Sequence, residues 1–285
     1  MIKIINYFFQ SLFIYVFFFI GLILRLKLGR VFFSYIFSLI GPTIKPKQII
    51  EKNLDIFSSY KGSINKNLIS SSMWKNYGKT FIEYVFLYKF QKNNSHIKIK
   101  GEKNLEKVLQ NKKPVIFVSG HFANFELMSM EITKKQIKLA TIYRPLNNIF
   151  LNPLMEYLRK KYVCNYQIKK GIKGVREAIS YLKKNYSIAL MIDQRVSEGE
   201  KINFFGKTAL TTTLPAQLAF KFNLEIVPVF IERTLKDNFV LEFQKSINVK
   251  NFKNKIELSQ ELNHILEKMI IKNPNQWIWT HNRWK

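Results

Sequence analysis

The stretch from Pro114 to Glu131, PVIFVSGHFANFELMSME, constrains the fold of this chain more than any other feature of its sequence. It begins with a β-branched and aromatic run, Val115 to Val118, which is typical of a buried strand. The small residues Ser119 and Gly120 end that run, and helix-compatible residues begin at Phe125. A strand, a tight turn and a helix in this order are typical of open α/β sheets, which expose reactive groups at the carboxyl ends of their strands.

His121 lies in the predicted turn, so its imidazole is a candidate general base. Glu126 follows five residues later, and on one continuous helix this spacing would separate the two side chains by roughly 140°. The two can meet only if His121 is in the turn and Glu126 is in the first turns of the helix, with Asn124 as a helix N-cap. In that arrangement we expect Glu126 to hold one ring nitrogen of His121 and leave the other free.

Predicted strands and helices alternate through the rest of the chain. We expect strands at Ile97–Lys100, Val115–Val118, Ile137–Tyr143, Ser187–Ile192 and Glu225–Ile231, and helices at Glu102–Leu109, Val175–Leu182 and Leu214–Phe222. This alternation predicts an α/β fold with a mostly parallel sheet covered by helices on both faces. The carboxyl ends of its strands would then bring His121, Arg144 and Asp193 to one edge.

The amino-terminal segment Ile4–Leu24 contains no charged residue and is about as long as a helix that crosses a ~30 Å hydrocarbon core. Arg25, Lys27 and Arg30 follow it, whereas Lys3 alone precedes it. This basic flank predicts that the rest of the chain stays on the cytoplasmic side. The segment could anchor the protein either as a full span or as a monotopic helix.

We expect three parts: an anchor in residues 1–30, a helical lead-in in residues 31–96, and a catalytic core in residues 97–285. The lead-in is expected because apolar and aromatic residues recur at helical spacing between Lys45 and Lys92. No internal repeat or low-complexity linker divides the remaining chain.

The chain carries 46 Lys and Arg against 19 Asp and Glu, a formal net charge of +27. Such a charge favours anionic lipids, phosphorylated substrates, an acidic carrier protein or nucleic acid. A membrane-tethered basic protein that binds nucleic acid is one alternative, but the lysines are dispersed and no known nucleic-acid module is present, so we expect no nucleic-acid partner. The single Cys164 excludes an internal disulfide, and the four histidines lack the spacing of zinc ligands.

Several motifs together resemble one family. GHFANFE around His121, YRPLNN after Tyr143, the Asp193–Gln194 pair, INFFGKTALTTT and the tail PNQWIWTHNRWK are similar to the pattern of the lipid A biosynthesis lauroyl/myristoyl acyltransferases. These enzymes belong to the glycerolipid acyltransferase superfamily, whose signature is His-x4-Asp/Glu. Two departures are Ala123, where the family commonly has Gly, and Phe125, where it commonly has Trp.

This resemblance implies transfer of a fatty acyl chain from acyl carrier protein to a hydroxyl of a lipid A precursor, a late step of lipopolysaccharide biosynthesis. The expected partners are acyl carrier protein, an anionic glycolipid acceptor and membrane lipids, and the expected location is the cytoplasmic face of a bacterial inner membrane. No metal or redox cofactor is expected. A glycerolipid, an ornithine lipid or another glycolipid is the alternative acceptor.

The predicted catalytic residues are His121 as base, Glu126 as its partner and Arg159 as a group that stabilises the oxyanion. Arg144 and Lys207 suit phosphate groups. The turn at Phe204–Gly206 and the following threonines are interpreted either as a loop before a capped helix or as a wall of an acyl pocket. The predicted substrate-binding residues are Arg144, Asn124, Asp193, Gln194, Phe205, Gly206, Lys207 and Thr211.

Overall fold

A computed structural model describes residues 2–285; residue 1, the first of the predicted anchor, lies outside the described residues. The helices are α1 (Ile2–Ile44), α2 (Lys47–Lys61), α3 (Lys66–Glu83), α4 (Leu87–Lys92), α5 (Glu102–Leu109), α6 (Glu126–Lys134), α7 (Asn152–Tyr162), α8 (Ile172–Lys183), α9 (Leu214–Phe222) and α10 (Lys255–Lys272). The strands are β1 (Ile97–Lys100), β2 (Ile116–Ser119), β3 (Leu139–Tyr143), β4 (Tyr166–Lys169), β5 (Ser187–Met191), β6 (Glu200–Phe204), β7 (Lys207–Thr211), β8 (Glu225–Arg233), β9 (Phe239–Phe243) and β10 (Ile247–Asn248).

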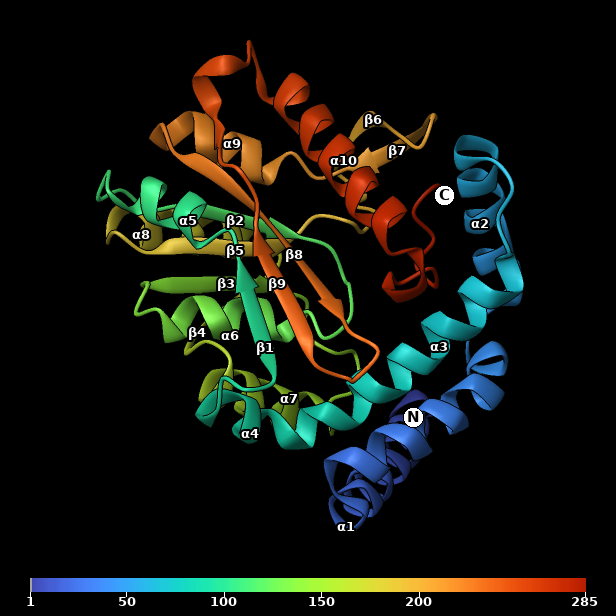
Figure 1. Cartoon of the computed structure of the whole chain (residues 1–285). Coiled ribbons are helices and arrows are strands. Elements are labelled where there is room, and N and C mark those ends of the chain that lie inside the picture. The colour runs from blue at the N-terminus through green and yellow to red at the C-terminus, as the bar shows by residue number, and fades with distance from the viewer. Residues whose placement is uncertain (1) are drawn as a thin grey trace.

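The main sheet has eight strands and confirms the predicted α/β class. Its order is β1-β9-β8-β2-β5-β3-β4, with β10 paired to β8, and the five strands from β8 to β4 are parallel. Helices α6 and α7 lie on one face, and α8, α9 and α10 lie on the other (Figure 1). All four residues of β2 are buried because this central strand has neighbours on both sides and helices on both faces.

The antiparallel part of the fold was not predicted from the sequence. Strand β9 runs antiparallel to β8, and β6 and β7 form a separate two-stranded hairpin. Strand β4 was not predicted either, because only one of its four residues is buried and it lacks the continuous apolar run of an inner strand.

The pairing of β2 with β5 decides which residues meet at the carboxyl edge of the sheet. Ser119 at the end of β2 lies opposite Met191 at the end of β5, and His121 and Asp193 each follow two residues later. Gly120 permits their approach, since a Cβ atom there would lie 2.8 Å from the Phe122 ring and 3.2 Å from the Asp193 carboxylate. The register of two buried strands therefore places this imidazole beside this carboxylate.

Helix α1 is divided into two arms by a reversal at Arg25, whose backbone angles are φ 58° and ψ 172°. The arms contact each other near the reversal, where a Cβ atom on Gly29 would lie 3.6 Å from the Gly21 carbonyl oxygen. Farther along, the rings of Phe17 and Phe33 are 5.7 Å apart. The predicted anchor is therefore one arm of a helical hairpin that folds back on the lead-in.

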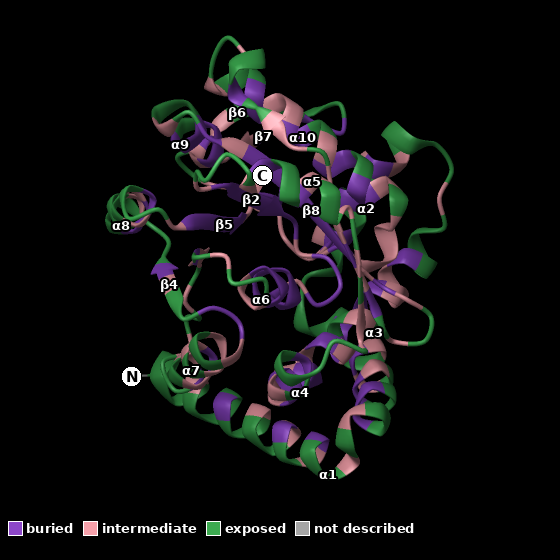
Figure 2. Ribbon diagram, turned by 60° about the vertical axis from the view of Figure 1, so that its left-hand side comes forward, coloured by how far each residue is buried: buried purple, intermediate pink, exposed green. Residues whose placement is uncertain are grey.

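One face of this hairpin packs on the rest of the protein and the other is open. Phe18 is buried, with its ring 4.9 Å from that of Phe81 on α3, and the Tyr15 hydroxyl donates to the Phe150 carbonyl oxygen at 2.7 Å. Most other residues of α1 are exposed and colour the helix green in Figure 2. By length and composition, α1 is the one described helix that is apolar enough to cross a membrane.

A buried ion cluster joins α1, α3, β8 and the loop after β2. Its centre is Glu83, which is inaccessible to solvent. One carboxylate oxygen of Glu83 accepts from Arg30 Nε at 2.6 Å and from Arg233 Nη1, and the other accepts from Arg233 Nη2 at 3.0 Å and from Asn124 Nδ2 at 2.9 Å. Burial raises the pKa of Glu83, but Arg233 and Arg30 outweigh this effect, so its pKa lies below the ordinary value.

We expect Glu83→Gln to destabilise the protein by about 3–5 kcal/mol, because two buried guanidinium groups lose their counter-charge. The free energy of unfolding in detergent micelles measures this loss. The wild type keeps the contribution above pH 4.5, the ordinary pKa of this carboxyl group, and loses it as the pH falls through the lower pKa of the folded state.

The matched control is Glu102→Gln, because Glu102 pairs with Lys135 at the surface and its side chain is 50% exposed. Its loss should change the free energy of unfolding by about 1 kcal/mol or less. Equal losses in the two variants would mean that the Glu83 cluster contributes no more than a surface pair.

Candidate active site

His121 and Asp193 form a close pair at the carboxyl edge of the sheet. Asp193 Oδ1 lies 2.7 Å from His121 Nδ1, and Oδ2 accepts the His121 backbone N–H at 2.7 Å. Burial raises the pKa of Asp193, but the charge and hydrogen bonds of His121 lower it further, so the carboxyl group is ionised. An ionised carboxylate can only accept, which places the proton of a neutral imidazole on Nδ1 and leaves the Nε2 lone pair free.

This geometry corrects the predicted pairing of His121 with Glu126. The Glu126 carboxylate accepts instead from the Tyr84 hydroxyl at 2.6 Å and from Arg159 Nε at 2.8 Å. Glu126 is the first residue of α6, and the first turn of that helix presents it toward Tyr84, directly after α3, and toward Arg159 on α7. The position beside the imidazole ring is occupied by the carboxylate of Asp193, which follows the neighbouring strand β5.

Asn124 also has a different role from the predicted N-cap. Residue Phe125 holds the N-cap position of α6, and no side chain caps the helix there. The Asn124 side chain donates to Glu83, so the loop that carries His121 is attached to the buried ion cluster.

Arg159 is held in place by two partners. Its Nη2 lies 2.7 Å from Glu126 Oε1 and 3.3 Å from the Tyr84 hydroxyl oxygen. Burial lowers the pKa of Arg159, but Glu126 and Tyr84 raise it by more, so the guanidinium group keeps its charge. A fixed cation beside a cavity can stabilise an anion that forms during a reaction.

A cavity of about 780 Å³ opens in front of these groups. Its walls are largely apolar and come from both arms of α1, from α3 and from the loop after β3; they include Ile14, Phe17, Phe37, Phe81, Leu146 and Leu151. The lining also includes the polar groups of His121, Glu126, Arg159, Arg144 and Gln194. An apolar cavity with a few converging polar groups suits a small molecule or a lipid chain.

Two cations stand at this cavity. Arg144, directly after β3, and Lys170, directly after β4, both line it. Burial and the charge of Arg144 lower the pKa of Lys170, and the more weakly acting charge of Glu198 opposes them. Among the ion pairs of residues 2–285, none includes either side chain. Two adjacent cations without a carboxylate partner form a favourable place for an anion.

The structure places four predicted substrate-binding residues away from this cavity. Phe205, Gly206, Lys207 and Thr211 belong to the β6–β7 hairpin, and none is among the described residues that line the cavity. Phe205 is buried and packs its ring 5.3 Å from Phe57, while the Thr211 hydroxyl accepts from the carboxy-terminal tail. The turn at Phe204–Gly206 is therefore a packed loop, whereas Thr212, directly after the hairpin, and Leu214 line the cavity.

Sequence reasoning missed three residues around the site. Tyr84 binds Glu126 and Arg159, His281 lines the cavity, and Trp277 donates from its indole nitrogen to Asp193. The dense aromatic residues of the tail PNQWIWTHNRWK were the available signal, but they carry no helical or strand period that would place them in space.

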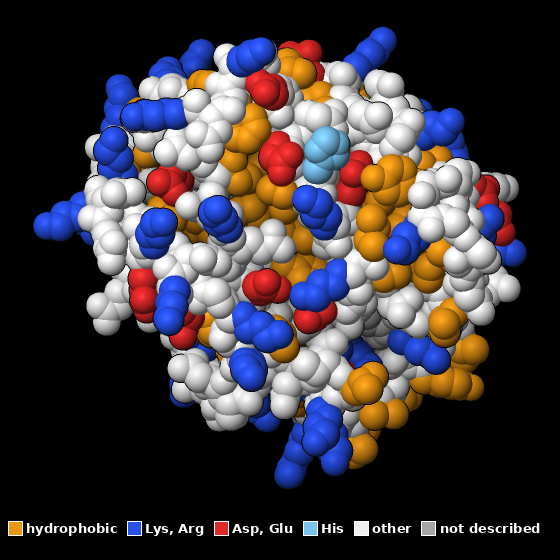
Figure 3. Space-filling view, turned by 45° about the horizontal axis from the view of Figure 1, so that its top comes forward, with side chains coloured by type: hydrophobic (Ala, Val, Ile, Leu, Met, Phe, Trp, Pro, Cys, Tyr) orange, Lys and Arg blue, Asp and Glu red, His pale blue; other side chains and the backbone are white. Residues whose placement is uncertain are grey.

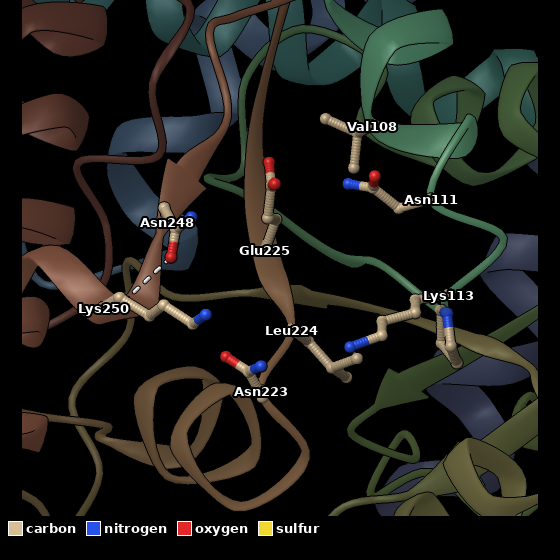
Figure 4. A pocket seen from close by; sticks show the side chains of 9 residues that line it. Val108, Asn111, Lys113, Asn223, Leu224, Glu225, Asn248 and Lys250 are labelled. Carbon is tan, nitrogen blue, oxygen red and sulfur yellow. Dashed lines mark hydrogen bonds between the residues drawn. The ribbon is translucent and has the colours of Figure 1, made fainter.

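A smaller cavity of about 280 Å³ lies at the opposite edge of the sheet. It borders the amino ends of β2 and β8, and Figure 4 shows Lys113, Glu225 and Lys250 around it. This position separates it from His121 by the length of the strands.

Comparison with known proteins agrees with the motifs. The sequence profile described as bacterial lipid A biosynthesis acyltransferase matches residues 2–285, nearly the whole chain. The chain belongs to this family. The protein is therefore an acyltransferase, and the resemblance noted in its motifs is confirmed.

Among solved structures, the acyltransferase is similar to the 1-acyl-sn-glycerophosphate acyltransferase PlsC from Thermotoga maritima. The two are 14% identical with a TM-score of 0.44, and the match covers 87% of this chain and 99% of that one. No curated protein matches the chain.

One departure of this lipid A-type acyltransferase from its family pattern strains the backbone. Ala123, in the loop after His121, has a φ of 44°, in the left-handed region that favours glycine. An L-residue with a side chain pays roughly 1–2 kcal/mol for this conformation. The Gly that is common at this position in the family would avoid that strain.

We therefore expect Ala123→Gly to raise the stability of the acyltransferase by about 1 kcal/mol, seen as a higher midpoint of thermal unfolding in detergent. Ala178→Gly is the control, because Ala178 is buried inside α8 with ordinary helical geometry. That change should lower stability by about 1 kcal/mol. A lower midpoint for both variants would contradict the strain at Ala123.

Proposed function

We propose that this acyltransferase transfers a fatty acyl chain from acyl carrier protein to a hydroxyl of a lipid A precursor. One observation carries the proposal. The ionised Asp193 holds Nδ1 of His121, which leaves Nε2 free, and the ring lines a largely apolar cavity. A hydroxyl is a weak nucleophile, so the reaction needs a base at the point where the acyl chain and the acceptor meet.

In the first step, His121 Nε2 takes the proton of the acceptor hydroxyl as the oxygen attacks the thioester carbonyl carbon. The imidazole becomes an imidazolium, and Asp193 stabilises its charge through Nδ1. General-base assistance of this kind contributes about 10²- to 10⁴-fold to the rate.

The attack creates a tetrahedral intermediate with a negative oxygen, which Arg159 stabilises in our proposal. Glu126 and Tyr84 then act as positioning groups for Arg159. When the intermediate collapses, the carbon–sulfur bond breaks, the ester remains on the acceptor, and the imidazolium returns its proton to the departing thiolate. Protons and electrons balance, and His121 is regenerated.

The apolar and the basic side chains of the cavity lining suit different parts of the two substrates. The apolar side chains of Phe17, Phe37 and Phe81 would surround the acyl chain. Arg144 and Lys170 would bind a phosphate group of the acceptor, because arginine can contact two phosphate oxygens at once. Gln194, another polar residue of the lining, would also contact the acceptor in our proposal.

The same proposal places the protein on the cytoplasmic face of a bacterial inner membrane. It keeps an anchor in residues 1–30, a helical lead-in in residues 31–96 and a catalytic core in residues 97–285. Phe18 and Tyr15 contact the rest of the protein from the first arm of α1, and the outer side chains Phe13 and Phe19 are exposed. These contacts support an anchor that lies along one leaflet beside the catalytic core.

The net charge of +27 supports an acidic donor protein and an anionic membrane. Lys and Arg side chains are spread over the whole face in Figure 3, some of them side by side, with fewer Asp and Glu between them. A dispersed positive surface of this kind attracts an acidic protein at long range, and this attraction weakens as salt is added.

The test is acyl transfer by the purified protein from acyl carrier protein to a lipid A precursor, followed by mass spectrometry of the lipids. The proposal expects the precursor to gain one acyl chain. A gain on phospholipid alone would overturn the proposed acceptor, and equal use of acyl coenzyme A would overturn the proposed donor.

We expect Asp193→Asn to lower kcat/KM by about 10³- to 10⁴-fold, because the amide can neither hold the reactive tautomer of His121 nor stabilise the imidazolium. Glu126→Gln should lower kcat/KM by about 10²- to 10³-fold, because Arg159 loses the carboxylate that holds it in place. Initial rates with acyl carrier protein as donor measure both effects, and thermal unfolding checks that each variant is folded. A larger loss of kcat/KM in Glu126→Gln than in Asp193→Asn would mean that Glu126, and not Asp193, is the carboxylate that supports His121.

Arg144→Gln should raise the KM for the acceptor about 10-fold and leave kcat unchanged, because a phosphate contact is made equally in the ground and transition states. Arg176→Gln is the matched control, since Arg176 is exposed on α8 and is outside the described cavity lining. Steady-state kinetics with varied acceptor distinguish the two. An unchanged KM in Arg144→Gln would remove Arg144 from the acceptor site.

A further inference from the structure

The carboxy-terminal tail, residues 274–285, lies between α10 and α2 (Figure 1) and reaches the loop that carries His121. Trp277 pairs with Phe122 in an isolated β-bridge, and the Gln276 carbonyl oxygen accepts from the Ala123 backbone N–H at 3.2 Å. Apart from one short 3-10 turn, the tail has no regular structure, yet the exposed fraction is 1% for Trp277 and 0% for Trp279. Its position is fixed by these contacts.

Trp277 touches the catalytic pair itself. Its indole Nε1 donates to Asp193 Oδ2 at 2.8 Å. The same oxygen accepts the His121 backbone N–H, and Oδ1 faces His121 Nδ1. The carboxylate is thus held by three hydrogen bonds, and the one from the indole is the only one of the three that does not come from His121.

We propose that Trp277 is a positioning residue of this acyltransferase, whose indole N–H orients the Asp193 carboxylate and thereby sets the strength of His121 as a base. This inference rests on the proposed function. A donor on Oδ2 draws negative charge away from the imidazole, because a carboxylate shares its charge among all the hydrogen bonds it accepts. It also fixes the plane of the carboxylate, which in turn fixes the imidazole ring.

A second contact from the tail supports this assignment. His281 Nε2 accepts the backbone N–H of Arg195 at 2.8 Å, two residues after Asp193. Burial lowers the pKa of His281 to about 4, so its ring is neutral and can accept this bond at physiological pH. The tail therefore holds the turn after β5 at Asp193 and again at Arg195.

The other charged groups near the pair do not obscure a pH measurement. Burial lowers the pKa of Arg283 to about 10, so Arg283 remains a cation, and His281 remains neutral, between pH 5 and 8. Lys170 and Arg144, directly after β4 and β3, the Glu126–Arg159 ion pair and Lys45 also line the cavity that His121 lines.

The chain offers a matched control in Trp279. Its indole donates to the Pro274 carbonyl oxygen at 2.8 Å and its ring lies 4.6 Å from that of Trp277. Trp277→Phe and Trp279→Phe each remove one buried N–H donor and shrink one buried ring. They differ in the acceptor, which is the catalytic carboxylate in one case and a backbone carbonyl in the other.

We expect both variants to lose similar thermal stability. Trp277→Phe alone should lower kcat about 10-fold with an unchanged acceptor KM. It should also move the acidic limb of the pH profile of kcat/KM upward by about half to one pH unit, because the carboxylate then directs more of its charge to the imidazolium. Trp279→Phe should keep the wild-type profile.

A second readout needs no acyl substrate. Diethyl pyrocarbonate modifies the neutral imidazole, so the modification of the His121 peptide across pH, followed by mass spectrometry, reports the protonation of that ring. We expect its midpoint to rise by the same amount in Trp277→Phe and to stay unchanged in Trp279→Phe. If Trp277→Phe does not fold, 3-benzothienylalanine at position 277 keeps the two-ring shape and lacks only the N–H.

Equal behaviour of the two variants in both readouts would overturn the proposal and leave Trp277 as a packing residue. A midpoint shift in Trp277→Phe alone supports it. If Trp277→Phe shows this shift but the wild-type protein transfers no acyl chain, the positioning of His121 by the tail stands and the proposed reaction fails.

Discussion

The architecture around the active site depends on one buried carboxylate, Glu83. It neutralises Arg30 from the amino-terminal hairpin and Arg233 from the end of β8, and it holds Asn124 in the loop after His121. Two buried guanidinium groups could not remain there without this counter-charge. The cluster therefore joins the apolar hairpin, the sheet and the catalytic loop at one point, and each of the three depends on the other two for its position.

The site divides its work between two separate carboxylates. Asp193 serves the imidazole of His121, whereas Glu126 serves the guanidinium of Arg159. Because the pairs are separate, His121 and Asp193 can transfer a proton while Glu126 holds the positive charge of Arg159 in place. Neither carboxylate has to bind a ring nitrogen and a guanidinium group at the same time. Burial strengthens both interactions because little water competes for the charges.

Helix α1 serves two purposes. Its outer side chains are exposed and apolar, whereas Ile14, Phe17 and Phe37 on its inner side line the cavity. If α1 anchors the protein, as we propose, the same helix brings the cavity to the level of the membrane surface. A free-standing span, joined only by a linker, would leave the cavity open to water and lose the apolar wall.

The sequence alone determined the parts of the fold that depend on local patterns. Buried strands and amphipathic helices leave short periodic signals, so the parallel sheet and the strand ends carrying His121 and Asp193 could be predicted. Only the tertiary structure decided which carboxylate meets the imidazole, because that choice follows from the register of β2 with β5 and from the direction in which α6 presents Glu126. The reversal of α1 at Arg25 and the bond from Trp277 to Asp193 were likewise decided there, since packing between segments distant in sequence leaves no local pattern to read.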